Sequence, residues 1–130
     1  MTRFVVDPTA LLHMLSEGTE VSARHELLAP TLVRSQLLSM YHEAVHRGEL
    51  EAEEARARLA HFNKMRMRLL GDAVLRRRAW ELADRLGWAK TYDAEYLALT
   101  QLQGDALVTL NDKLINAGVV PIASIDDLES

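Results

Sequence analysis

The sequence predicts an α/β fold in which helices flank a short, mostly parallel sheet in three layers. Short apolar runs alternate along the chain with longer helical segments, which is typical of a parallel sheet covered on both faces. At 130 residues the chain has the length of one domain and can bury a substantial core. Its hydrophobic fraction of 48% argues against disorder. We therefore expect residues 1–130 to form a single domain.

The expected elements alternate along the chain. Strands are expected at residues 4–6, 27–29, 64–69, 106–110 and 119–122. Helices are expected over residues 8–17, 31–47, 51–62, 72–86, 93–103 and 111–117. Short helical turns are expected at residues 21–25 and 125–128.

The first strand and helix are predicted by their boundary residues. Phe4 to Val6 is an apolar run, and the Asp7-Pro8 pair that follows it is a favourable helix start. Gly18 is a typical residue for the end of that helix. The second strand is again a short apolar run, and Pro30 closes it.

The next two helices are expected to form a hairpin. Thr31 is a preferred N-cap and Gly48 a typical stop for a helix with an apolar stripe. Residues 51–62 are rich in alanine and in paired charges, as in an exposed helix. Met65 and Met67 then alternate with basic residues, which indicates a strand with one solvated face.

Capping residues also mark the last elements. Asp72 and Gly87 bound one helix, and Gly104 ends the next. The apolar run over residues 106–110 predicts a strand, after which Asn111 caps a short helix.

The charge of the chain is unevenly distributed. Residues 56–90 carry ten basic and three acidic residues, a charge of +7, whereas the whole chain carries −4. Such a basic belt can bind a polyanion, although solvated helix faces explain many surface arginines.

Several function classes lack support in the sequence. Without cysteine, neither a disulfide nor a thiolate metal site can form. No nucleotide-binding glycine motif and no serine-hydrolase elbow is present. There is no signal-peptide pattern, and no apolar run approaches the roughly 18 residues of a membrane span, so we expect a cytoplasmic protein.

Polar side chains that can bind a cation follow two of the predicted strands. Asp7 follows the first strand, and Asn111 and Asp112 follow the strand over residues 106–110. Asp93 lies in the first turn of a helix that returns to the sheet. Since open parallel sheets bind ligands beyond the carboxyl ends of their strands, these side chains can share one crevice. Carboxylates gathered there favour a hard cation such as Mg²⁺ or Mn²⁺, which can activate water against a phosphodiester.

Each of these residues also has a purely structural explanation. Asp7 and Asn111 are preferred helix caps, and Asp93 is an acid in a first helical turn. The functional interpretation depends on their joint placement.

Four motifs resemble PIN-domain ribonucleases, in particular the VapC-type toxins of bacterial toxin–antitoxin pairs. They are FVVDPTALL, LLAPTLVRSQLL, TYDAEYLALTQ and ALVTLNDKL, and they cover almost the whole chain in the right order. The resemblance implies a parallel sheet flanked by helices, and a site in which acids bind Mg²⁺ or Mn²⁺ to cut RNA. It implies that Asp7 and Asp93 are metal ligands and catalytic residues.

Two positions depart from the pattern of this family. The resemblance places a glutamate six residues after Pro30, where this chain has Gln36, and an acid two residues after Thr109, where it has Asn111. Both remain candidate catalytic residues, because each keeps a carbonyl oxygen although it loses a charge. Gln36 is expected to point into a polar pocket, and Asp112 is a possible substitute acid if the turn shifts. Fewer carboxylates predict weak metal binding and a slow or conditional nuclease.

The resemblance also implies partners. It predicts an endoribonuclease toxin that hydrolyses RNA with a metal-activated water, forms a homodimer and binds a small antitoxin protein. Arg66, Arg68, Arg76 and Arg77 are candidates for binding RNA or that partner. One alternative is a weakened or inactive PIN-like module that binds an antitoxin or RNA. Another is an unrelated three-layer α/β regulator in which Asp7 only caps a helix.

Overall fold

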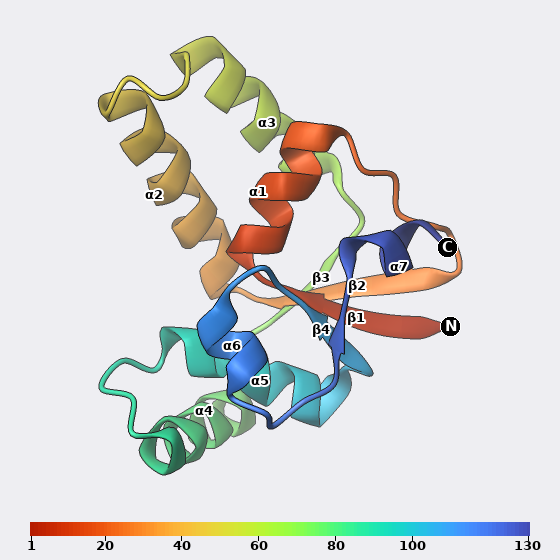
Figure 1. Ribbon diagram of the computed structural model, residues 1–130, viewed down its shortest axis with the longest axis vertical. Helices are drawn as coiled ribbons and strands as arrows, with labels where there is room; N and C mark the ends of the chain where they lie inside the picture. The colour runs from red at the N-terminus through yellow and green to blue at the C-terminus, as the bar shows by residue number, and fades with distance from the viewer.

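A computed structural model describes residues 1–130 as a five-stranded sheet with seven helices (Figure 1). The strands are β1 (Thr2–Val6), β2 (His25–Pro30), β3 (Arg68–Leu70), β4 (Ala106–Val108) and β5 (Ile122–Ala123). The helices are α1 (Pro8–Glu17), α2 (Leu32–His46), α3 (Ala52–Lys64), α4 (Ala73–Leu86), α5 (Tyr92–Gln103), α6 (Asp112–Asn116) and α7 (Ile125–Glu129). The sheet order is β3-β2-β1-β4-β5, and every neighbouring pair is parallel.

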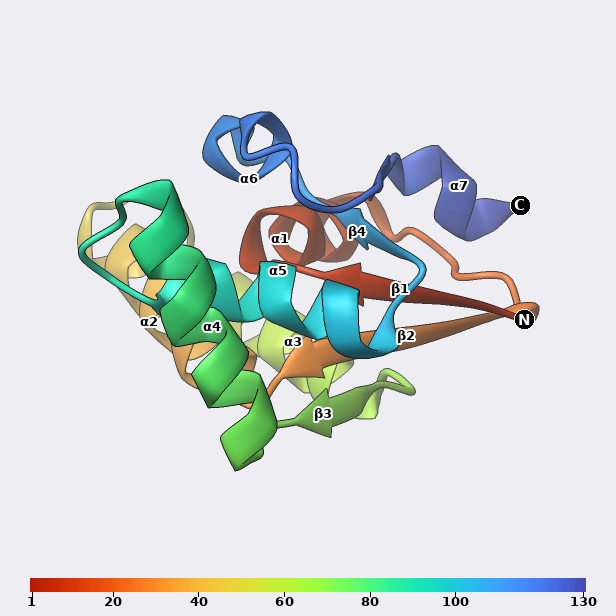
Figure 2. The ribbon, with the colours of Figure 1, turned by 90° about the horizontal axis from the view of Figure 1, so that it is seen from below.

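Helices cover both faces of the sheet, so the predicted three-layer α/β/α class is confirmed. Figure 2 shows α4 and α5 in front of the sheet and α1 and α3 behind it. Helix α5 packs on β1, β2 and β4, while α1 packs against the hairpin of α2 and α3. Because both faces are covered, the central strands are almost continuously apolar.

The central strand β1 brings the chain to the edge where the site forms. Phe4, Val5 and Val6 are all buried. Phe4 lies opposite Leu27 of β2, and Val6 lies opposite Val108 of β4. Because these strands are parallel and in register, the residues that follow β1 and β4 emerge side by side.

Side chains cap helices where the sequence predicts, with one exception. The predicted caps each accept a backbone N–H: Asp7 from Ala10, Asp72 from Leu75 and Asn111 from Lys113. The prediction for Thr31 is wrong, since its side chain makes no capping bond. Its backbone is already helical, with φ −56° and ψ −26°, whereas a side-chain cap requires an extended N-cap residue.

Several predicted boundaries are wrong because pairing in the sheet decides them. No helical turn forms over residues 21–25, and His25 instead begins β2 opposite Thr2. The strand expected over residues 64–69 is limited to β3, because α3 continues to Lys64 and only Arg68 to Leu70 pair with β2.

The last strands also differ from the expectation. The strand expected over residues 106–110 ends at Val108, because its pairing with β1 and β5 ends there, opposite Val6 and Ala123. The final strand is β5, shorter and later than the expected range of 119–122.

Tyr96 of α5 has the largest of the fully buried side chains. Its hydroxyl must find a partner inside the protein, and that partner belongs to the site described below. None of the helices combines the length and the apolar character needed to cross a membrane.

Candidate active site at the carboxyl edge of the sheet

Asp7 lies at the junction of β1 and α1 and is 2% exposed. Its Oδ1 accepts hydrogen bonds from the Ala10 N–H at 3.0 Å and the Thr9 hydroxyl at 2.7 Å. Its Oδ2 accepts from the Thr109 hydroxyl at 2.6 Å. No basic side chain pairs with it. Asp7 is therefore both a helix cap and a buried carboxylate without a counter-ion.

Burial raises the pKa of the Asp7 carboxyl above its ordinary value. The hydrogen bonds from Thr109, Ala10 and Thr9 lower that pKa but do not cancel the effect of burial. The negative charge of Asp93 raises it further. The charge of Asp93 thus acts on Asp7, although the two acids are far apart in the chain.

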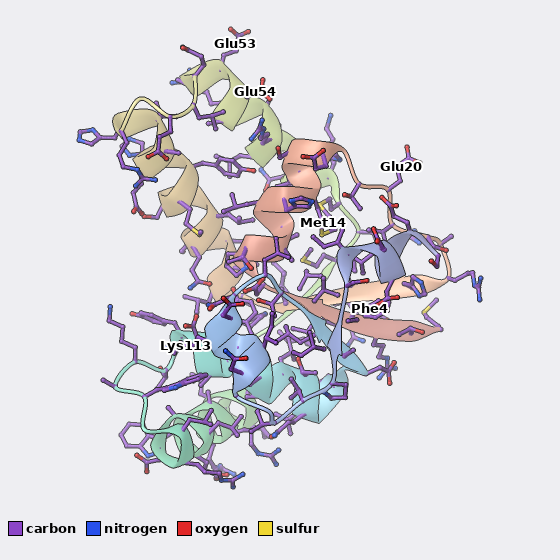
Figure 3. The ribbon with its side chains drawn as sticks, viewed as in Figure 1. Phe4, Met14, Glu20, Glu53, Glu54 and Lys113 are labelled. Atoms are coloured by element: carbon purple, nitrogen blue, oxygen red, sulfur yellow. The ribbon has the colours of Figure 1, made fainter.

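Asp93 lies in the first turn of α5 and is half-buried. Its Oδ2 accepts a hydrogen bond from the Lys113 ammonium at 3.2 Å. The same ammonium lies 4.3 Å from the centre of the Trp88 ring. Figure 3 shows Lys113 on α6, on the side of the molecule that carries α4 and α5.

Gln36 points into the molecule as predicted, and it contacts the site through Tyr96. The Tyr96 hydroxyl donates to Gln36 Oε1 at 2.5 Å. Burial raises the pKa of Tyr96, and the charges of Asp7, Glu95 and Asp93 raise it further, so the phenol is a neutral donor. Gln36 therefore bonds the Tyr96 hydroxyl directly, and the charges of the two acids act on that hydroxyl through space.

Asn111 follows β4 and is linked to Asp7 through the Thr109 hydroxyl. Its backbone N–H donates to Thr109 Oγ1 at 3.0 Å, and its Oδ1 accepts the Lys113 N–H at 3.0 Å. The turn is therefore fixed with Asn111 as the cap. Asp112 is exposed on the first turn of α6 and has neither a hydrogen bond nor an ion pair through its side chain.

The structure separates the four candidate arginines into two pairs. Burial raises the pKa of Glu95 on α5, and the positive charge of Arg76 on α4 partly opposes that effect. Arg77 is its exposed neighbour on α4. Arg66 and Arg68 instead line a cavity of about 680 Å³ together with His25, near the amino ends of β1 and β2. That cavity includes none of the site carboxylates.

Sequence reasoning left Thr9, Tyr96, Glu95, Trp88 and Lys113 without a role in the site. Their only signal in the sequence is that each lies within a few residues of a predicted site residue. Other polar side chains share that property, so the sequence does not single these five out. Only the fold shows which of them point to the site. No cluster of three or more acidic or histidine side chains is close enough to hold a metal ion.

A comparison with protein families matches residues 5–120 to the PIN domain. Among curated proteins, the VapC ribonuclease Mb0985 of Mycobacterium bovis is 30% identical over 117 residues, which are 88% of this chain and 90% of that protein. Ribonuclease VapC9 of Mycobacterium tuberculosis has the same identity and coverage.

Solved structures share the fold at lower identity. PAE2754 from Pyrobaculum aerophilum has a TM-score of 0.78 at 20% identity, and the match covers 98% of this chain and 87% of that one. VapBC2 from Rickettsia felis, bound to a promoter DNA fragment, has a TM-score of 0.64 at 12% identity, covering 94% and 98%. At sequence identities this low, the similarity shows a shared fold and nothing more.

Proposed function

The chain belongs to the PIN-domain family, and from this premise we propose that it is a metal-dependent endoribonuclease, the toxin of a toxin–antitoxin pair. The curated relatives at 30% identity are ribonucleases, which supports RNA as the substrate. The observation that supports the proposal most is the buried Asp7 carboxylate, which has no basic partner, lies at the edge where parallel sheets bind ligands and is within electrostatic reach of Asp93.

The donor atoms of the site suit a hard divalent cation such as Mg²⁺ or Mn²⁺. They are carboxylate and amide oxygens, with no sulfur or imidazole. Asp7 is a buried carboxylate without a basic partner, a costly state that a bound cation relieves. Asp7 and Asp93 would hold the ion, and Gln36 and Asn111 could add neutral oxygens. When bound, such an ion polarises a phosphodiester and lowers the pKa of water.

The chain's own residues position the reactive groups. Thr9 and Thr109 orient the Asp7 carboxylate, each through one short hydrogen bond. Tyr96 orients the Gln36 side chain from the core. Arg76 and Arg77 lie on the α4 side of the site, where cations attract the phosphates of an RNA strand.

An antitoxin is the second partner that we propose. A toxin–antitoxin complex from Klebsiella pneumoniae contains a chain of similar fold, with a TM-score of 0.56. Next to Thr109, the exposed side chains of Leu110, Ile115 and Ile122 line an apolar surface that can bind a partner segment. We also infer a single PIN-like domain over residues 1–130 that acts in the cytoplasm as a homodimer, and light scattering of the purified protein tests the dimer.

A second candidate function is a weakened or inactive PIN-like module that binds an antitoxin or RNA. Gln36 and Asn111 favour it, because they leave two carboxylates where the family pattern has more. Metal affinity falls with the number of charged ligands, so the two functions predict different activities.

An RNA cleavage assay separates the two functions. The protein is incubated with a structured RNA and Mn²⁺, beside the Asp7→Asn and Gln36→Glu variants. We expect Asp7→Asn to lower the cleavage rate at least about 100-fold, since it removes a ligand charge. We expect Gln36→Glu to increase the rate, because Tyr96 can donate to the new carboxylate as it does to the amide.

Glu53→Gln is the matched control, because it makes the same acid-to-amide change at the far end of α3, remote from α6 (Figure 3). Its cleavage rate should equal that of the unmodified protein. Equal traces for all four proteins would eliminate the nuclease function and leave the binding module.

A further inference from the structure

The ammonium group of Lys113 already lies at one of the two proposed metal ligands. Its Nζ is 3.2 Å from Asp93 Oδ2 and 4.3 Å from the centre of the Trp88 ring. Asp93 therefore has a cationic partner within the chain, whereas Asp7 has none. The two carboxylates are not equivalent ligands for an external cation.

The framework of the site holds Lys113 in this position. Thr109 bonds Asp7 through its hydroxyl, and the Asn111 N–H bonds the same hydroxyl oxygen. The Asn111 side chain in turn accepts the Lys113 backbone N–H. A continuous series of hydrogen bonds thus leads from Asp7 to the residue whose ammonium reaches Asp93. Its position is set by the same turn that forms the site.

The charges around the site show what this ammonium does to a metal ion. Asp7, Asp93 and Glu95 are the acidic groups whose charges reach Tyr96, and Gln36 and Asn111 are neutral. Lys113 and Arg76 supply the opposing charges. A divalent cation that binds Asp93 must displace the Lys113 ammonium or share the carboxylate with it. Either outcome weakens the binding of the metal.

We propose that Lys113 is a built-in counter-ion of Asp93 that competes with the divalent metal for this carboxylate. This inference rests on the proposed function, because it takes Asp93 to be a metal ligand. The site then binds its metal fully only after the ammonium leaves Asp93. Activity becomes conditional on metal concentration, even with both acids in place.

The competition is moderate in strength. The Lys113 side chain is 46% exposed and that of Asp93 is 33% exposed, so water screens their attraction. The Trp88 face attracts the same ammonium and so favours its position beside the carboxylate. We expect these two contacts together to lower metal affinity about tenfold.

Metal titration by calorimetry tests the inference without any RNA. MnCl₂ is titrated into the protein and into Lys113→Met, which keeps the length of the side chain and removes its charge. We expect Lys113→Met to bind Mn²⁺ about tenfold more tightly, and Lys113→Arg to bind as weakly as the unmodified protein. Lys64→Met is the control, because it removes the same charge from the end of α3.

Tryptophan fluorescence reports the movement of the ammonium directly. In a Trp80→Phe background, Trp88 is the only tryptophan. We expect Mg²⁺ to change its emission when Lys113 is present and to leave it unchanged in Lys113→Met. A purely structural role of Lys113 predicts the same response in both proteins.

Two results would overturn the inference. If Lys113→Met binds Mn²⁺ no more tightly than the unmodified protein while Asp93→Asn loses binding, Lys113 does not compete, yet Asp93 is still a ligand and the proposed function stands. If neither the unmodified protein nor Lys113→Met binds Mn²⁺, removing the ammonium creates no metal affinity. The metal-dependent function then fails together with the inference.

Discussion

At the scale of single residues, the buried Asp7 has opposing effects on stability and function. Its carboxylate caps α1 and accepts two hydroxyl hydrogen bonds, yet burial makes its charged form costly. Because its pKa is raised in the folded chain, the folded protein binds this proton more tightly than the unfolded chain does. The free energy of unfolding therefore falls as the pH rises above the ordinary value of 3.8.

This sign leads to a prediction for Asp7→Asn. Asparagine caps helices as well as aspartate does and carries no charge, so the variant should gain about 1 kcal/mol of unfolding free energy at neutral pH without metal. Its stability should also vary less between about pH 4 and 7. Urea unfolding across that range measures both effects. Asp112→Asn is the exposed control, and a less stable Asp7→Asn at neutral pH would contradict the prediction.

At the scale of elements, the acids of the site lie where strands end and helices begin. Asp7 follows β1, Thr109 follows β4, and Asp93 lies in the first turn of α5, so the geometry depends on how these elements approach one another. Gly104 lies at the other end of α5, where the chain turns into β4, and it sets how closely α5 approaches β1. It has an ordinary φ of −99°, but a Cβ here would lie 2.8 Å from Val5 Cγ2 and 3.3 Å from Thr100 Cα.

Gly104→Ala should therefore destabilise the protein through crowding. Val5 is fully buried and stiff, so α5 and β1 must separate to admit the new methyl group. We expect a loss of about 1–3 kcal/mol in the free energy of unfolding, measured in urea. The neighbouring Gln103→Ala is exposed and should change it by less than about 0.5 kcal/mol. Equal stability of both variants would show that no close contact exists at Gly104.

At the scale of the whole molecule, the basic belt of the sequence does not form one surface. Arg76 and Arg77 belong to α4 and lie near the acids of α5. Arg66 and Arg68 lie by the cavity at the amino ends of β1 and β2, where Arg68 also pairs with Glu26 at 3.0 Å. We therefore expect the α4 pair, and not the other pair, to bind an RNA strand that crosses the proposed site.

RNA affinity should therefore respond to one arginine pair and not to the other. In an Asp7→Asn background, replacing Arg76 and Arg77 by glutamine should reduce the slope of log affinity against log salt by about 1.4, the value for two lost contacts to single-stranded RNA. The same change at Arg66 and Arg68 should leave the slope nearly unchanged. Fluorescence anisotropy at several KCl concentrations measures both. Equal slopes for the two double variants would mean that RNA binding is spread over both ends.

The sequence by itself determined the α/β class and most helix boundaries of this protein. Apolar runs, capping aspartates and terminal glycines act over a few residues, so they can be recognised without the fold. It also predicted that Asp7 and Asp93 lie at one edge of the sheet, because the ligands of parallel sheets bind beyond the carboxyl ends of the strands. The sequence did not predict the exact bounds of the strands at residues 68–70 and 122–123, because their lengths depend on the neighbouring strand with which each pairs.

Only the tertiary structure decided which partner each polar side chain finds. Tyr96 bonds Gln36, Lys113 bonds Asp93, and the arginines separate toward opposite ends of the sheet. Such contacts join residues distant in the chain, and they depend on strand register and helix rotation to within an ångström or so. A local sequence pattern does not fix positions to that precision. Only the fold therefore shows that Asp93 is paired with Lys113, whereas Asp7 has no basic partner.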